Sequence, residues 1–415
     1  MLSLSSLAER AVRSRLAALR RGRVVLRDGG STTAFGDATA APLGIVVEDR
    51  RFYPAVALGG ALGAAEAFAQ GWWTTDDLTG VVRLMLRNRD ALEGLEEGWA
   101  RAAGPLRRLA NLLRRNTPRG SRRNIRAHYD LGNDFFATFL DDTLTYSCAL
   151  FERPDASLRD ASIAKYERMA ALLALEPGDH LLEIGTGWGG FAIHAARRFG
   201  CRVTTTTISA EQARLARERA GEAGLADRVT VLERDYRDVE GAYDKLVSIE
   251  MIEAVGHEYF DAFFAKCAGL LKPAGRFALQ AITIRDDRYE AARREVDFIK
   301  RYIFPGGCLP SLAVLRRAAS ATDLRLERVD EIGPHYAETL RRWRANFRRN
   351  REAVSALGFD ERFRRIWEFY FGYCEGAFLE RAIGDVQLAF AKPAAAALGP
   401  VAAPPAPPAA VGVAA

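Results

Sequence analysis

The stretch Leu181-Leu182-Glu183-Ile184-Gly185-Thr186-Gly187-Trp188-Gly189-Gly190-Phe191-Ala192 decides the fold. A short apolar run ends in an acid, passes through several glycines and continues as helix-forming sequence. Glycines at a strand-to-helix turn let the backbone bend sharply and approach a ligand closely, and the helix that follows directs its free N–H groups toward that ligand. The stretch therefore predicts a binding site for a nucleotide-like cofactor.

The type of cofactor follows from the acids around this turn. The glycines also have the dinucleotide-binding spacing G-x-G-x-x-G, at Gly185, Gly187 and Gly190. A dinucleotide site needs an acid at the end of the second strand, about 20 residues further on, to hold the ribose. Residues 202–209 supply hydroxyl groups instead, and the first acid is Glu211. Glu183, directly before the glycines, fits a site for S-adenosylmethionine, in which a carboxylate can meet the cofactor's ammonium group.

The segment around this turn alternates between strand-like and helix-like sequence. Strands are predicted over 180–184, 202–208, 229–232, 245–249 and 276–284, and helices over 190–199, 210–223 and 259–271. This order is typical of an α/β protein with a doubly wound, mostly parallel sheet, which binds its ligands at the carboxyl ends of the strands. Four polar residues fall at or just past such ends: Glu183, Thr207, Asp235 and Glu250.

The flanking segments predict two further parts. Residues 1–115 form a smaller, mainly helical N-terminal domain, and residues 116–392 form the domain that holds the cofactor. Beyond residue 284 we expect a charged helix, an edge hairpin of the same sheet and two helices that cover the substrate pocket, over 286–301, 324–332 with 385–391, 341–351 and 363–378. Residues 393–415 contain too many prolines for a membrane-spanning helix and predict a disordered Ala/Pro tail.

Composition limits the partners and the compartment. The 415 residues carry a net charge of +6, which suits an anionic partner such as phospholipid headgroups or nucleic acid. The five scattered cysteines form no C-x-x-C pair, which argues against a zinc site or a disulfide framework and suits a reducing cytoplasm. Residues 101–126 hold nine arginines and no acid. Because leucines recur there at helical spacing, this segment is either a solvated linker or a basic amphipathic helix on a membrane surface.

Several separate motifs resemble the cyclopropane-fatty-acyl-phospholipid synthase family. They are Ala127-His128-Tyr129-Asp130-x-Gly132-Asn133-Asp134, Tyr146-Ser147-Cys148, Glu183-x-Gly185-x-Gly187-Trp188-Gly189, Thr207-Ile208-Ser209-x-x-Gln212, Glu250-Met251-Ile252-Glu253-x-Val255-Gly256 and Tyr302-Ile303-Phe304-Pro305-Gly306-Gly307. The resemblance runs from about residue 124 to residue 392. It implies a Rossmann-like class I methyltransferase fold and an S-adenosylmethionine-dependent enzyme that alkylates the double bond of an acyl chain. More loosely, residues 1–115 resemble an N-terminal extension that helps to dock such enzymes on membranes.

The resemblance also implies roles for individual residues. Cofactor contacts would fall on Tyr146, Ser147, Glu183, Gly185, Gly187, Thr207, Ile208, Gln212, Tyr236 and Arg237. A bicarbonate ion, the base of the family, would be held by Cys148, Glu253, the backbone of Ile282, Tyr336 and the residue at Gln280. Gln280 departs from the family, which usually has histidine there. Since an amide can neither be protonated nor relay a proton, the ion is held differently here or another base acts.

The expected chemistry leaves two products open. Methyl transfer to an alkene leaves a carbocation, which aromatic faces or a carboxylate can stabilise. Loss of a proton then gives a cyclopropane, or rearrangement gives a methyl-branched chain that a separate reductase completes. The expected partners are unsaturated acyl chains at the inner face of the membrane. A homodimer is also compatible with the sequence. The alternatives are a methyltransferase for a small hydroxyl or amine substrate and a non-catalytic lipid-binding protein. A nucleic-acid substrate is not expected, because the aromatic C-terminal cover fits a lipid chain better.

Overall fold

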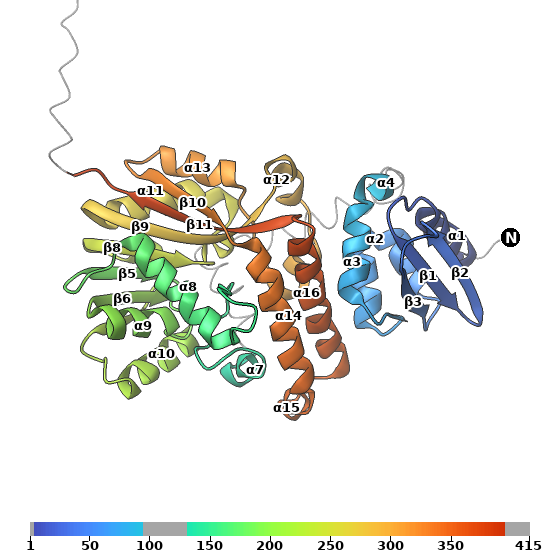
Figure 1. Ribbon diagram of the computed structural model, residues 1–415, viewed down its shortest axis with the longest axis horizontal. Helices are drawn as coiled ribbons and strands as arrows, with labels where there is room; N and C mark the ends of the chain where they lie inside the picture. The colour runs from blue at the N-terminus through green and yellow to red at the C-terminus, as the bar shows by residue number, and fades with distance from the viewer. Residues whose placement is uncertain (1–3, 94–130, 395–415) are drawn as a thin grey trace, which may run out of the picture.

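The computed structural model describes residues 4–93 and 131–394 (Figure 1). The arginine-rich segment, the His128-Tyr129-Asp130 part of the first motif and residues 395–415 lie outside the described residues, as does the expected domain boundary near residue 115. The predictions made for them therefore stay predictions.

A seven-stranded sheet with the order β10-β11-β9-β8-β5-β6-β7 forms the centre of the larger part. Its parallel strands are β5 (His180–Ile184), β6 (Arg202–Thr207), β7 (Val229–Glu233), β8 (Tyr243–Ile249) and β9 (Leu271–Ile284). The predicted parallel sheet and its five strands are confirmed. The predicted edge pair consists of β10 (Arg325–Glu331) and β11 (Ile383–Ala391), which pair antiparallel in the same sheet, with β11 next to β9.

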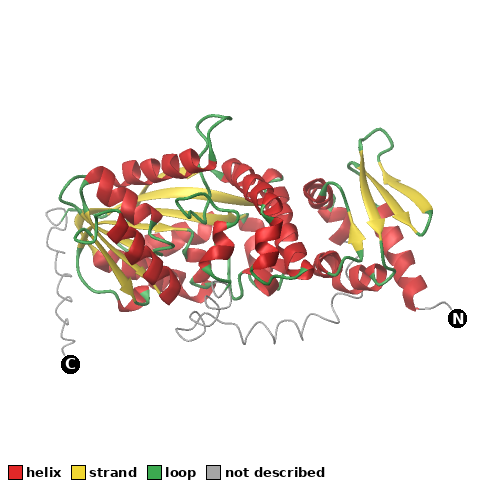
Figure 2. Cartoon of the chain, turned by 90° about the horizontal axis from the view of Figure 1, so that it is seen from below, coloured by secondary structure: helices red, strands yellow, loops and turns green. Residues whose placement is uncertain are grey.

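Helices cover both faces of this sheet (Figures 1 and 2). On one face lie α8 (Leu158–Leu173), α9 (Gly190–Phe199) and α10 (Ala210–Glu222), and on the other α11 (Phe260–Leu270) and α13 (Leu312–Ser320). The side chains of successive β5 residues point to opposite faces of the sheet, since Leu181 packs in the α8–α10 layer and Leu182 in the α11 layer. Burial on both faces explains the apolar residues Leu181 and Leu182 at successive positions of this central strand.

The C-terminal helices form a separate layer beside the sheet. Helix α14 (Gly333–Arg349) packs along α16 (Glu361–Leu379), with the short α15 (Arg351–Ala356) between them. The expected single helix over 286–301 is wrong. The chain forms α12 (Asp286–Ala292) and then a π-helical turn, η4 (Ile299–Ile303). The break lets Phe298, which is buried, pack against Phe369 of α16 with ring centroids 4.8 Å apart.

The N-terminal unit combines helices with a small sheet. The helices are α1 (Leu4–Ala17), α2 (Phe52–Ala69), α3 (Leu78–Arg87) and α4 (Arg89–Glu93). The strands are β1 (Arg23–Asp28), β2 (Ser31–Gly36), β3 (Pro42–Val47) and β4 (Trp73–Thr74), in the order β2-β1-β3-β4. Helices α2 and α3 pack on α16, so the unit lies against the C-terminal layer (Figure 1). Helix α2 has the length and apolar composition of a membrane span, but it is kinked at Gly60 and 44% of it is buried.

Candidate active site

The glycine turn after β5 has the backbone conformation that its sequence predicts. Gly185 has a φ of +102°, which residues with a side chain rarely adopt. A Cβ at Gly190 would lie 2.2 Å from the Tyr166 hydroxyl, so only glycine fits where α9 begins. The turn is fixed from outside by Trp188, whose Nε1 donates to Oδ1 of Asn133 at 2.6 Å. The start of α9 and the strand ends together line a cavity of about 420 Å³.

Polar side chains at the ends of β6 and β7 line the same cavity. Thr207 Oγ1 donates to Oε1 of Gln212 at 2.8 Å, which leaves the Gln212 amide NH₂ group available to a ligand. Asp235 accepts from Nε and Nη2 of Arg237 at 2.8 and 2.6 Å. The buried hydroxyl of Tyr236 has no hydrogen-bond partner among the described residues. These donors and acceptors suit the ribose and the adenine of a nucleoside cofactor.

Glu183 is the penultimate residue of β5, just before the glycine turn. Its Oε2 accepts from Thr205 Oγ1 at 2.6 Å, and its side chain is only 3% exposed. Burial raises the pKa of Glu183 to about 8, against the opposing effects of the Thr205 hydrogen bond and the Lys165 charge. Without a charged ligand nearby, this carboxyl group is therefore mostly protonated at neutral pH. A cationic ligand group close by would favour its ionised form.

A buried lysine lies behind the Tyr146-Ser147 motif. Lys165 of α8 is 1% exposed, and its Nζ donates to Oγ of Ser147 at 2.7 Å. Burial lowers the pKa of Lys165, while the charge of Glu250 and those of other acids oppose this shift. The ammonium also lies 4.9 Å from the centroid of the Tyr166 ring. Lys165 therefore fixes Ser147 at the wall of the cavity.

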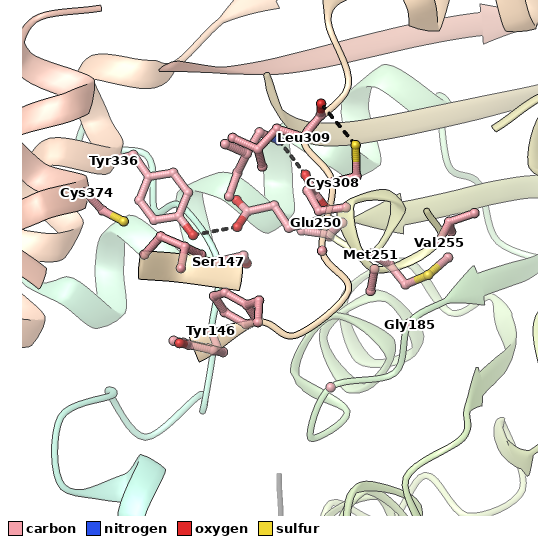
Figure 3. A pocket seen from close by; sticks show the side chains of 18 of the residues that line it. Tyr146, Ser147, Gly185, Glu250, Met251, Val255, Cys308, Leu309, Tyr336 and Cys374 are labelled. Atoms are coloured by element: carbon pink, nitrogen blue, oxygen red, sulfur yellow. Dashed lines mark hydrogen bonds between the residues drawn. The ribbon is translucent and has the colours of Figure 1, made fainter. Parts of the chain in front are cut away.

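Glu250, one residue beyond β8, accepts hydrogen bonds from three separate segments. Its Oε1 accepts from the backbone N–H of Cys148 at 2.8 Å and from Nε2 of Gln280 at 2.7 Å. Its Oε2 accepts from the Tyr336 hydroxyl at 2.7 Å (Figure 3). The backbone of Glu250 has a φ of +49°, in the left-handed region that non-glycine residues rarely adopt. The carboxylate is thus held at the cavity wall by three donors.

Glu253 lies three residues further along the same loop. Its Oε1 accepts from the backbone N–H of Ile282 at 2.5 Å, and its Oε2 is buried without a hydrogen-bond partner among the described residues. Burial, and secondarily the charge of Glu250, raise the pKa of Glu253 to about 8. Glu253 therefore favours its protonated form at neutral pH and can donate a hydrogen bond.

A buried polar layer supports Glu250 from inside the sheet. Gln387 Nε2 on β11 donates to Oε1 of Gln280 at 2.9 Å, which orients the Gln280 amide so that its Nε2 faces Glu250. The same Nε2 lies 3.3 Å from Oδ2 of Asp385. Burial, followed by the charges of Glu250 and Glu253, raises the pKa of Asp385 well above its ordinary value. Within this layer, the Gln280 amide donates to Glu250 and does not face the open cavity.

Beyond these polar groups, one part of the cavity wall is aromatic and apolar. Tyr336 stacks on Phe378 with ring centroids 4.5 Å apart, and the Tyr146 hydroxyl donates to that of Tyr370 at 3.1 Å. Aromatic rings of the C-terminal layer and of η4 line the wall, namely Phe304, Tyr336, Tyr370, Tyr373 and Phe378. The cavity also reaches Leu86 of α3 in the N-terminal unit. The polar end of the cavity, which suits a cofactor, thus continues into a channel with apolar and aromatic walls.

Comparison with known proteins identifies the family. The family described as mycolic acid cyclopropane synthetase matches residues 116–388. The chain is 41% identical to tuberculostearic acid methyltransferase UfaA1 of Mycobacterium tuberculosis over 371 residues, covering 86% of this chain and 84% of that protein. It is 36% identical to cyclopropane-fatty-acyl-phospholipid synthase of Escherichia coli over 356 residues, covering 85% of this chain and 89% of that protein. The chain belongs to the cyclopropane synthase family.

A solved structure supports the cofactor. The mycolic acid cyclopropane synthase CmaA1, solved with S-adenosylhomocysteine and CTAB, superimposes with a TM-score of 0.62 at 34% identity, covering 65% of this chain and 98% of that one. The fold prediction is thereby confirmed as a class I methyltransferase. The chain is an S-adenosylmethionine-dependent methyltransferase of the C-methylating kind.

The structure places all ten predicted cofactor contacts at the cavity: Tyr146, Ser147, Glu183, Gly185, Gly187, Thr207, Ile208, Gln212, Tyr236 and Arg237. Of the predicted catalytic residues, Glu253, Ile282 and Tyr336 also line it. Cys148 and Gln280 do not line the cavity and instead contact Glu250. The roles of all these residues stay predictions, although their placement fits the roles assigned to most of them.

The predicted bicarbonate site does not fit the residues present. Cys148, Gln280 and Tyr336 were expected to hold the ion, but the backbone N–H of Cys148, the amide of Gln280 and the hydroxyl of Tyr336 all donate to Glu250. The backbone N–H of Ile282 donates to Glu253. The Cys148 thiol is fully buried, and burial raises its pKa well above the ordinary value, so it supplies no thiolate. A carboxylate of the chain thus occupies the donors that would hold the ion.

Proposed function

We propose that this enzyme transfers the methyl group of S-adenosylmethionine to the cis double bond of an unsaturated acyl chain in a membrane phospholipid. The observation that carries the proposal is the continuity of one cavity from the glycine turn, past Glu250 and Glu253, into an aromatic and apolar channel. An alkene has no polar group to recognise, so an apolar channel of this kind suits it. The names of the relatives, which include a tuberculostearic acid methyltransferase and a cyclopropane-fatty-acyl-phospholipid synthase, support the same substrate class.

The residues of the chain suit a carbocation route. Bound S-adenosylmethionine supplies an electrophilic methyl group, and its transfer leaves a positive charge on the acyl chain. The rings of Tyr146, Phe304 and Tyr370 line the cavity and can stabilise that charge through their faces. The Glu250 carboxylate, held by three hydrogen bonds, adds a fixed negative charge in a water-poor site. The apolar wall keeps water from the cation.

The N-terminal unit supports lipid access. The cavity reaches Leu86 and Arg89, and α3 of the same unit packs on α16. Basic and acidic residues both line this part, namely Arg89, Arg288, Arg293 and Lys300 with Glu295 and Asp297. Leu58 of α2 is 48% exposed at the surface of the same unit. We therefore propose that the N-terminal unit docks on the inner face of the cytoplasmic membrane and that the acyl chain reaches the cavity beside α3.

Two products remain candidates, each with a relative in its favour. Ring closure gives a cyclopropane, as the name of the Escherichia coli relative states, whereas a hydrogen shift before proton loss gives a methylene-branched chain. A separate reductase must then add a hydride and a proton to give a methyl branch, the type of product that the name of UfaA1 indicates. Because UfaA1 is the more similar of the two and Gln280 replaces the usual histidine, we propose the methylene-branched product.

The experiment uses the purified full chain, S-adenosylmethionine with a labelled methyl group, and vesicles of cis-unsaturated phosphatidylglycerol. We expect label in the acyl fraction, and an added CH₂ unit in the fatty acids after hydrolysis. Since the two products are isomers, catalytic hydrogenation followed by mass spectrometry separates them. Label that enters a small water-soluble acceptor, with none in the acyl fraction, would contradict the proposal and favour a small-molecule methyltransferase. Binding of cofactor and lipid without any transfer would favour a lipid-binding protein.

A further inference from the structure

Glu250 is held as a bound anion would be held. Its two oxygens accept from a backbone N–H, an amide and a phenol that come from residues 148, 280 and 336, at 2.7–2.8 Å. These three donors hold a planar carboxylate at the wall of the cavity, and Figure 3 shows the one from Tyr336. The φ of +49° at Glu250 costs conformational free energy, which the surrounding structure must offset. Such strain at a cavity wall is typical of a functional residue.

We infer that Glu250 is the built-in general base of the reaction, and that its carboxylate takes the place of a free bicarbonate ion. The inference deepens the proposed function and rests on it. It also explains Gln280, because a neutral amide that donates one hydrogen bond suits a carboxylate acceptor that is already part of the chain. Nothing in this arrangement requires residue 280 to carry a proton.

The step balances without an added reactant. After methyl transfer the acyl chain is a cation, and Glu250 is a carboxylate. One C–H bond of the transferred methyl group breaks, its proton goes to a carboxylate oxygen of Glu250, and the electron pair forms the new carbon–carbon bond. That bond closes a cyclopropane, or it becomes the C=C bond of a methylene group after a hydrogen shift. The products are a neutral chain and a protonated Glu250, which returns its proton to solvent before the next turnover.

The neighbouring groups are less suitable for this role. Glu253 has a pKa raised to about 8 by burial and by Glu250, so it holds its proton where Glu250 must be free to accept one. Asp385 is fully buried behind Gln280 and does not line the cavity. The Tyr336 hydroxyl is committed as a donor to Glu250. Of the described acids Glu250, Glu253 and Asp385, Glu250 alone combines its place at this wall with three donors that favour its ionised form.

The test compares the full-length wild type with two substitutions at this position. Glu250→Gln keeps the shape but removes the basicity, and we expect product formation to fall by about 100-fold or more. Glu250→Gly removes the carboxylate and suits the positive φ, so it opens a space of the size of a small carboxylate. In buffer freed of carbon dioxide we expect no product from Glu250→Gly, and a saturable recovery when bicarbonate is added. Glu152→Gln and Glu152→Gly, in an exposed loop, are the matched controls.

A binding measurement separates failure of this inference from failure of the proposed function. With S-adenosylhomocysteine present, the carbon-13 signal of labelled bicarbonate should broaden with Glu250→Gly and stay sharp with wild type and with both controls. This result would place Glu250 in the anion position even if no lipid substrate reacted. A wild type that needs added bicarbonate, a wild type that binds it, or a Glu250→Gln variant with full activity would each overturn the inference.

Discussion

Replacing Glu183 by glutamine should make the stability of the protein less dependent on pH. The carboxyl group of Glu183 is 3% exposed, and burial raises its pKa from the ordinary 4.5 to about 8. The folded protein therefore keeps a proton on Glu183 over a range in which the unfolded chain has lost it. Because the folded state binds more protons there, the free energy of unfolding must fall as pH rises from about 4.5 to about 8.

The size of this effect follows from the two pKa values. Each pH unit between them lowers the free energy of unfolding by about 1.4 kcal/mol, so the full loss is at most about 5 kcal/mol above pH 8. Glutamine has the same shape, its amide oxygen can still accept from Thr205, and it has no proton to lose. The Glu253 carboxyl titrates in both proteins, so its contribution cancels in the comparison.

The assay is urea unfolding of the cofactor-free protein at about pH 5.5 and about pH 7.5. Between these values we expect wild type to lose about 3 kcal/mol more than Glu183→Gln does, at about 1.4 kcal/mol per pH unit. Glu176→Gln, at an exposed position in the loop before β5, is the control and should behave like wild type. Equal losses for wild type and Glu183→Gln would refute the reasoning, because Glu183 would then be ionised in the folded state.

Three further predictions concern packing and membrane contact. Phe135→Ala removes a fully buried ring whose centroid lies 4.6 Å from that of Trp367, and it should lower the free energy of unfolding by about 3–5 kcal/mol. Leu357→Ala, at an exposed position, is the control and should change the free energy of unfolding by less than about 0.5 kcal/mol. Gly376→Leu would place a Cβ 2.8 Å from the Val82 side chain and so weaken the packing of α3 on α16. Limited proteolysis should then cut between the N-terminal unit and the rest of the chain faster than in wild type. An unchanged cleavage pattern would mean that α3 and α16 accommodate the leucine side chain. A variant with reversed charge at four arginines should lose more activity on anionic vesicles than on detergent-dispersed lipid; the four are Arg107, Arg108, Arg114 and Arg115. Equal losses on both would indicate that these arginines have a structural role.

The cofactor half of the site was predictable because its signals are local. The apolar run, the acid and the glycines are contiguous, and the turn they predict forms where β5 meets α9. The Ser209 cap and the Thr207–Gln212 pair lie within a few residues of one another. In such segments the sequence pattern and the observed contacts concern the same short stretch of chain.

The reacting half was less predictable because its contacts join distant segments. Glu250 was expected only to lie just past the carboxyl end of its strand, and its three donors come from positions 148, 280 and 336. Lys165 and Asp385 were missed, since an isolated lysine on a helix and an aspartate on a strand usually face solvent. One signal was present: Gln280 in place of histidine indicated that the base is held differently or is a different group.

If Glu250 acts as the base, a proton must leave the transferred methyl group inside the cavity. The direct measurement supplies S-adenosylmethionine with a trideuteriomethyl group and an unsaturated phospholipid, and counts deuterium in the product fatty acid by mass spectrometry. We predict that two of the three deuterium atoms are retained, because either a ring or a methylene group must lose one to the base. A product that keeps all three would contradict the account, since it would show methyl transfer without deprotonation of that group.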